Sequence, residues 1–176
     1  MLSIDVKPFT CRAEYEGVLD YFFQADEVFL RAMGVDPAKL PRRDAWLDRL
    51  LADLGREDRE KETYYLAWSN DGAPVGHSNV NKIIYGKEAY MHLHIWDRRF
   101  RKSGLGTAFL RESTNTFIQK FELKNLYCEP YAENRAPNRV LSKLGFRLIK
   151  RYRTVPGIIN FEQEVNRYVI DHEIPG

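Results

Sequence analysis

The feature that most constrains the fold is a short glycine-containing segment between two strongly patterned runs. Residues 89–96 form an alternating, largely apolar run typical of a strand, and residues 105–121 carry apolar side chains at helical spacing. The segment that joins them is Arg101-Lys102-Ser103-Gly104-Leu105-Gly106-Thr107. The sequence therefore predicts a strand, a short basic loop and the start of a helix at this point.

Such a loop has the chemistry of an anion site. Glycine lets the backbone approach a ligand closely, and the first N–H groups of a helix lack intrahelical partners at the positive end of its dipole. Arg101 and Lys102 add positive charge. A pyrophosphate would suit this turn. An ordinary glycine-containing turn is the alternative, because so short a string also occurs by chance.

The length and composition limit the possible functions. The 176 residues suffice for one domain, expected to span residues 1–176. A net charge of +2 argues against a dedicated nucleic-acid binder, and no apolar run approaches the roughly 20 residues that a membrane span needs. Cys11 and Cys128 lie far apart without metal-ligand spacing, so we expect reduced thiols in a cytoplasmic protein.

The other patterned runs predict an α+β order. We expect strands over residues 3–9, 63–69, 75–85, 126–129, 146–153 and 164–171, and helices over 11–33, 46–54 and 134–144. The turn residues at 70–72, Asn-Asp-Gly, predict a hairpin and hence an antiparallel meander of the strands over 63–96. The strand over 126–129 follows a strand and a helix. It is therefore expected to lie parallel to the strand over 89–96.

A second segment, residues 134–146, has the sequence NRAPNRVLSKLGF. Together with the glycine loop and the order of the elements, it resembles the GNAT family, the Gcn5-related N-acetyltransferases. In pattern it is most similar to the branch of ribosomal-protein Nα-acetyltransferases. The resemblance implies a three-layer α/β/α fold with a mixed, mostly antiparallel central sheet that splays between two parallel strands. It also implies acetyl-CoA as co-substrate.

The resemblance also implies which residues bind the cofactor. The glycine loop would hold the pyrophosphate through Arg101, Lys102, Ser103, Gly104, Leu105, Gly106 and Thr107. The gap between the parallel strands would open after Trp96 and beside residues 128–130. A free backbone N–H near Trp96 would bond the thioester oxygen. Asn134 would contact the far side of the cofactor, or merely cap its helix, and Asn138 follows on the same helix face.

Three side chains are candidates for the general base. Alternation places His92 and His94 on one face of the strand over 89–96, and Glu129 ends the parallel strand. Histidine has an unperturbed pKa of about 6.5, which suits proton acceptance at neutral pH. Alternatively, the histidines are ordinary sheet residues satisfied by their neighbours. A metal site at this pair would need a third ligand, which the sequence does not offer, so no metal is predicted.

The predicted function is transfer of an acetyl group from acetyl-CoA to a primary amine of a small molecule or a protein N-terminus, in a ternary complex. By resemblance, the acceptor would lie between residues 35–41 and 154–163, and the C-terminal strands could form a homodimer. Pro137 and Leu141 stand where family members carry a serine and a tyrosine, so no general acid carries over. The alternative is therefore a non-catalytic acyl-CoA sensor or partner-binding module.

Overall fold

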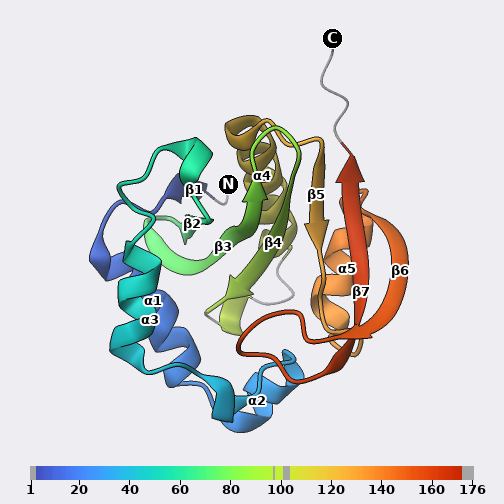
Figure 1. Ribbon diagram of the computed structural model, residues 1–176, viewed down its shortest axis with the longest axis horizontal. Helices are drawn as coiled ribbons and strands as arrows, with labels where there is room; N and C mark the ends of the chain where they lie inside the picture. Colours follow the sequence, from blue (N-terminus) through green and yellow to red (C-terminus); the bar gives the residue numbers. More distant parts are fainter. Residues whose placement is uncertain (1–2, 97, 101–103, 172–176) are drawn as a thin grey trace.

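A single seven-stranded sheet with helices on both faces forms the molecule (Figure 1). The computed structural model describes residues 3–96, 98–100 and 104–171. Its helices and strands, in chain order, are β1 (Ile4–Pro8), α1 (Arg12–Phe23), α2 (Glu27–Ala32), α3 (Arg43–Leu51), β2 (Thr63–Asn70), β3 (Ala73–Ile84), β4 (Glu88–Ile95), α4 (Leu105–Phe121), β5 (Asn125–Cys128), α5 (Arg135–Lys143), β6 (Arg147–Thr154) and β7 (Gln163–Asp171).

The sheet has the mixed topology that the sequence predicts. The strand order is β1-β2-β3-β4-β5-β7-β6. β4 and β5 run parallel, and the other neighbouring pairs of described strands run antiparallel. The α4 crossover that joins β4 to β5 makes this parallel pairing possible. The α+β class and the single parallel pair are therefore confirmed.

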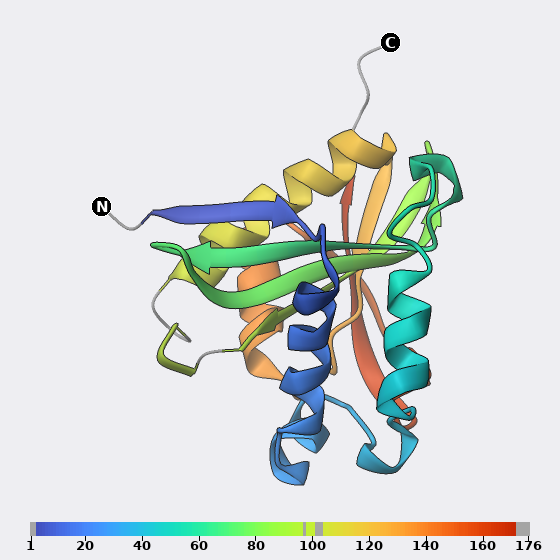
Figure 2. The same cartoon turned by 90° about the vertical axis from the view of Figure 1, so that its left-hand side faces the viewer.

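Two helical layers cover the sheet. Figure 2 shows α1 and α3 lying side by side over the sheet, on the side opposite α4. Aromatic and aliphatic side chains of α1 and α3 form one core with β2, around Leu19, Leu47 and Tyr65. α4 and α5 form the other core with β3 and β4, around Phe117 and Met91. The predicted three-layer arrangement is thus confirmed.

The predicted helix over residues 11–33 is wrong in one respect, because it is two helices. α1 ends at Phe23, and α2 begins at Glu27. Asp26 caps α2, since its Oδ1 accepts the N–H of Phe29 at 2.7 Å. Apolar spacing continues across this break, so periodicity alone does not reveal it. None of the helices in the described part of the chain has the length and apolar character needed to cross a bilayer.

Candidate active site

The β4–β5 pair separates after only three residue pairs. Pairing runs from Glu88 with Asn125 to Tyr90 with Tyr127, whereas β4 continues to Ile95. β5 instead keeps β7 as its partner as far as Cys128. A gap therefore opens between two adjacent strands in the middle of the sheet, and it begins earlier along β4 than the predicted position after Trp96.

Backbone alternation along β4 decides which amides face this gap. The Trp96 N–H donates to the Val75 carbonyl of β3 at 2.9 Å, so a free donor near Trp96 must come from another residue of β4. Successive residues of a strand direct their backbone groups to opposite edges. Leu93 lies an odd number of residues before Trp96, so its backbone groups face the opposite edge of β4. It also lies past the last β4–β5 pair. Its N–H group therefore faces the gap.

The predicted anion loop is described only in its second half. Arg101, Lys102 and Ser103 lie outside the described residues. Gly104 precedes α4 with φ +85°, a left-handed conformation that favours glycine, and a Cβ there would meet no atom of the described residues within 4 Å. The backbone at Gly104 is thus exposed and open to a ligand at the N-terminus of α4.

The next three residues of the loop start α4. Leu105 packs its side chain in the core, so only its backbone could face a ligand. Gly106 lies against Ile95 of β4, where a Cβ would come within 3.2 Å of that side chain. The Thr107 N–H donates to the Gly104 carbonyl at 3.1 Å, which closes the first turn. This packing fixes the N-terminus of α4 at the end of β4.

The two predicted asparagines of α5 differ in their partners. Asn134 is the N-cap residue, but its side chain makes no capping hydrogen bond and has no other partner among the described residues. Asn138 donates to the carbonyls of Tyr131 and Asn134, at 3.1 and 2.7 Å, and accepts from Asn166 at 2.7 Å. Asn134 is therefore available to a ligand, whereas Asn138 is held inside the fold.

A third histidine joins the two that the sequence singled out. The β3–β4 register pairs His77 with His94, and their rings stack with centroids 4.9 Å apart. His77 is buried, and its Nδ1 accepts the indole N–H of Trp96 at 2.8 Å. Sequence reasoning missed His77, because its position opposite His94 depends on the pairing of the strands.

The three histidines are kept neutral by their surroundings. Burial, with the positive charge of Lys82 adding to it, lowers the pKa of His92 to about 4. Burial and the neighbouring His92 lower the pKa of His94 to about 3, and burial lowers the pKa of His77 well below its usual value. The Nε2 of His92 is buried without a partner in the described part of the chain. His92 thus offers a free nitrogen of low basicity.

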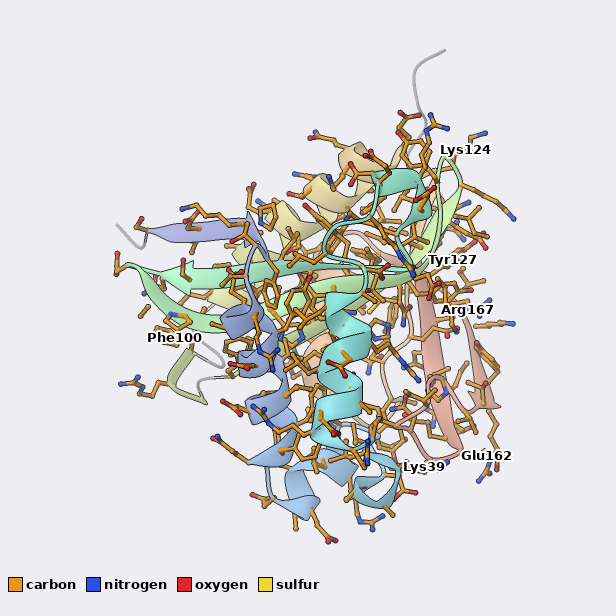
Figure 3. All side chains as sticks on the ribbon, turned by 60° about the vertical axis from the view of Figure 1, so that its left-hand side comes forward. Lys39, Phe100, Lys124, Tyr127, Glu162 and Arg167 are labelled. Carbon is orange, nitrogen blue, oxygen red and sulfur yellow. The ribbon has the colours of Figure 1, made fainter. Side chains whose placement is uncertain are left out.

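Glu129, the third predicted base, belongs to a closed polar cluster. Its carboxylate accepts hydrogen bonds from the Arg167 Nε and the Tyr152 hydroxyl. Arg167 also lies 5.6 Å from the ring centroid of Tyr127, and Figure 3 shows these two residues together on β7 and β5. Burial first, and then the hydrogen bond to Glu129, raise the pKa of Tyr152 to about 12. The Glu129 carboxylate is therefore already engaged by two donors within the fold.

A pocket of about 390 Å³ lies at the end of β4, beside the histidines. It is lined by Gly17, Asp20, Tyr21, Gln24, Ala25, Phe29 and Trp96. The Tyr21 ring lies 5.3 Å from the His94 ring, measured between centroids. A Cβ on Gly17 would come within 3.0 Å of the Trp96 indole, so glycine at this point of α1 lets the indole form one wall.

The two loops expected to flank the acceptor are joined to each other. The Gly34 carbonyl accepts from the side chains of Gln163 and Asn160, at 2.7 and 2.9 Å. The Lys39 Nζ donates to the Asn160 carbonyl at 2.9 Å. Figure 3 shows Lys39 and Glu162 at the same corner of the molecule. We call this set of contacts the loop clasp.

The described residues contain no group of three histidine, cysteine, aspartate or glutamate side chains that could hold a metal ion. The histidine cluster therefore does not form a metal site within the described part of the chain.

Comparisons with solved structures agree with this architecture. The ribosomal L7/L12 alpha-N-protein acetyltransferase RimL in complex with coenzyme A is 13% identical, with 96% of this chain and 94% of that chain covered and a TM-score of 0.77. Spermidine N-acetyltransferase from Vibrio cholerae, in complex with CoA and spermine, is 13% identical, with coverages of 96% and 95% and a TM-score of 0.74. Ribosomal-protein-S5-alanine acetyltransferase from Vibrio fischeri is also 13% identical, with coverages of 96% and 92% and a TM-score of 0.72.

Sequence comparison identifies the family. No curated protein sequence matches the chain significantly. The family model described as the acetyltransferase (GNAT) domain matches residues 6–147, which contain the β4–β5 gap, the α4 turn and Asn134. The chain therefore belongs to the GNAT acetyltransferase family.

Proposed function

We propose that the protein transfers an acetyl group from acetyl-CoA to a primary amine of a small molecule or a protein N-terminus, by direct attack in a ternary complex. The observation that carries the proposal is the gap between β4 and β5, together with the Asn134 side chain, which has no hydrogen-bond partner among the described residues, and the exposed backbone of Gly104. Structural neighbours crystallised with CoA, and in one case with spermine, support it.

The residues of the gap suit a bound thioester. Leu93 directs its N–H into the gap, so this group would bond the thioester oxygen and stabilise negative charge that develops there. The α4 turn at Gly104 would hold the pyrophosphate, and the Asn134 amide would bond the pantetheine arm. Acetyl-CoA supplies the activated acyl group. The protein supplies position and hydrogen-bond donors.

We assign proton acceptance to His92, because its Nε2 is unpartnered among the described residues and stays neutral at pH 7. A base with a pKa of about 4 removes a proton poorly from the ammonium form of a strongly basic amine. An α-amine, with a pKa near 8, needs far less help than an alkyl amine near 10.4. The site therefore favours an α-amine acceptor.

The role of His92 is tested by His92→Ala. Because the side chain would act only on the amine, turnover should fall about 10²-fold or more while acetyl-CoA affinity stays unchanged. Steady-state rates from pH 6 to 9, with calorimetric Kd values for acetyl-CoA, measure both. Equal rates in the variant and the parent protein across this range would exclude His92 as the base.

Direct transfer fits the surroundings of the cysteine beside the gap. Burial raises the pKa of Cys128 to about 12, so its thiol is a poor nucleophile and no acyl-enzyme is proposed. The second candidate function, a non-catalytic acyl-CoA-binding module, is favoured by Leu141, which is buried where other members carry a tyrosine. Both functions require cofactor binding, so turnover separates them.

The deciding experiment has two steps. Calorimetric titration with acetyl-CoA and free CoA, using ATP as control, should detect binding of the first two ligands only. Release of CoA thiol is then measured against a panel of amines. Binding with thiol release supports the transferase. Binding without release for every amine favours the sensor, and absence of binding contradicts both functions.

A further inference from the structure

The pocket beside Trp96 is apolar and aromatic in character. Tyr21, Phe29 and Trp96 contribute rings to its lining, and Gly17 and Ala25 add no polar side chain. The other lining residues are Asp20 and Gln24. The Asp20 carboxylate accepts a hydrogen bond from the Arg43 Nη2 at 2.7 Å, so its charge is already compensated. The pocket therefore suits an apolar group better than a cation.

The pocket lies next to the point where the amine would react. His94 follows Leu93, the residue whose amide faces the gap, and its ring contacts both Tyr21 and Phe22 with centroids 5.3 Å apart. Trp96, two residues further along, closes the pocket. A substituent on the carbon that bears the reacting amine would therefore reach the pocket directly.

The walls are fixed by contacts within the protein. The Trp96 indole N–H donates to His77 at 2.8 Å, and the Tyr21 hydroxyl contacts the Met33 sulfur at 3.0 Å. The volume of about 390 Å³ lies in the lower part of the range of about 300–1,000 Å³ for small-molecule sites. One ring-sized group fits this space. A long polyamine chain would extend beyond the pocket, and its positive charges would find no partner there.

Resting on the proposed function, we infer that the pocket beside Trp96 receives an apolar or aromatic side chain of the acceptor. The preferred substrate class is an α-amine whose neighbouring carbon bears such a side chain, as in a hydrophobic amino-acid derivative or a protein N-terminus that begins with one.

Thiol release with three probe amines tests this inference. Phenylalaninamide should have a kcat/KM at least about tenfold above that of alaninamide, because even one methylene in an apolar pocket is worth about 10-fold or more. Spermidine, which is strongly basic and lacks an apolar side chain, should be the poorest acceptor.

Substitutions in the pocket test whether the preference for phenylalaninamide arises there. Ala25→Leu fills the space, so the kcat/KM for phenylalaninamide should fall about tenfold while that for alaninamide changes by less than about twofold. Phe29→Ala removes one wall and should reduce the same preference, which guards against a folding defect in the first variant. Val28→Leu is the matched control, because Val28 is 80% exposed on the same helix as Phe29.

The outcomes separate the two proposals. Thiol release without a preference for phenylalaninamide, or with spermidine as the best acceptor, overturns the inference and leaves the transferase standing. Weaker acetyl-CoA binding in a folded Ala25→Leu variant, with amine preference unchanged, would assign the pocket to the cofactor and also overturn the inference. If no amine releases thiol while acetyl-CoA still binds, both proposals fail.

Discussion

The two asparagines at the start of α5 show how neighbouring residues of one type can differ in whether the fold uses their side chains. Asn134 starts the helix without using its side chain, whereas Asn138 joins the helix to the segment before it and to β7 through three hydrogen bonds. Both residues sit on the same helix face, so spacing alone cannot tell them apart. The distinction comes from which polar atoms the fold itself satisfies.

Substitution of each asparagine should therefore have opposite consequences. Asn134→Ala should leave the thermal midpoint unchanged and weaken acetyl-CoA binding by about two- to tenfold, the usual worth of one hydrogen bond. Asn138→Ala should leave partners unsatisfied and lower the free energy of unfolding by about 1–3 kcal/mol. Denaturant unfolding and calorimetry measure the two quantities. A destabilised Asn134→Ala protein would contradict the assignment.

The histidine site was only partly predictable from the sequence. Alternation correctly places His92 and His94 on the face opposite Met91, because the side-chain period of a strand is fixed. The partnership of His77 with His94 depends on the β3–β4 register, which shifts between Asn81 and Ile84. An irregularity of this kind leaves no periodic signal in the sequence.

At the scale of elements, the antiparallel meander and the parallel pair follow from local signals, but the gap in the sheet and the break before α2 do not. Hairpin residues and the strand–helix–strand order specify the meander and the parallel pair. The β4–β5 gap instead depends on where β5 leaves β4 while keeping β7 as its partner. The break before α2 depends on one capping side chain, Asp26, inside a continuous apolar pattern.

The loop clasp joins the segment after α2 to the start of β7. Gln163 is buried, and its Nε2 donates to the carbonyls of Gly34 and Phe161, at 2.7 and 3.1 Å. Gln163→Met keeps the side-chain size and removes both bonds. It should lower the free energy of unfolding by about 1–3 kcal/mol and raise the KM for the amine.

Gln163→Met should leave the affinity for acetyl-CoA unchanged, because the residues proposed to hold the cofactor, Gly104 and Asn134, lie on other elements. Glu162→Gln is the neighbouring control at an exposed side chain, and it should behave like the parent protein. Steady-state kinetics in the amine and calorimetry with acetyl-CoA measure the two effects. An unchanged KM in Gln163→Met would separate the loop clasp from acceptor binding.

For the whole molecule, the neutral histidines link stability to pH. All three have a folded-state pKa below the unfolded value, so the unfolded chain binds more protons between the two values. The contribution of the neutral histidines to stability is therefore fully present above about pH 6.5. It declines as the pH falls toward their folded-state pKa values. The cost arises because protonation would place charge inside an aromatic core.

The free energy of unfolding should decrease from pH 6.5 to 5 by about 2 kcal/mol for each of His92 and His94, a window in which most carboxylates stay ionised. His94→Phe keeps an aromatic ring against Tyr21 and removes one titrating group. Its decline should be smaller by about 2 kcal/mol. Urea unfolding at several pH values provides the comparison, and parallel curves for the two proteins would refute the linkage.

The loop clasp can form only late in the synthesis of the chain. Gly34 and Gln163, its central partners, are separated by 129 positions in the chain. During synthesis, β4, the α4 turn and α5 emerge before β7. Under the proposed function, the elements assigned to the cofactor can thus form before the loop clasp, which would flank the acceptor, is complete. If the proposed function holds, the ability to recognise an amine would arise only with β7, and a chain that stops short of residue 163 would lack it.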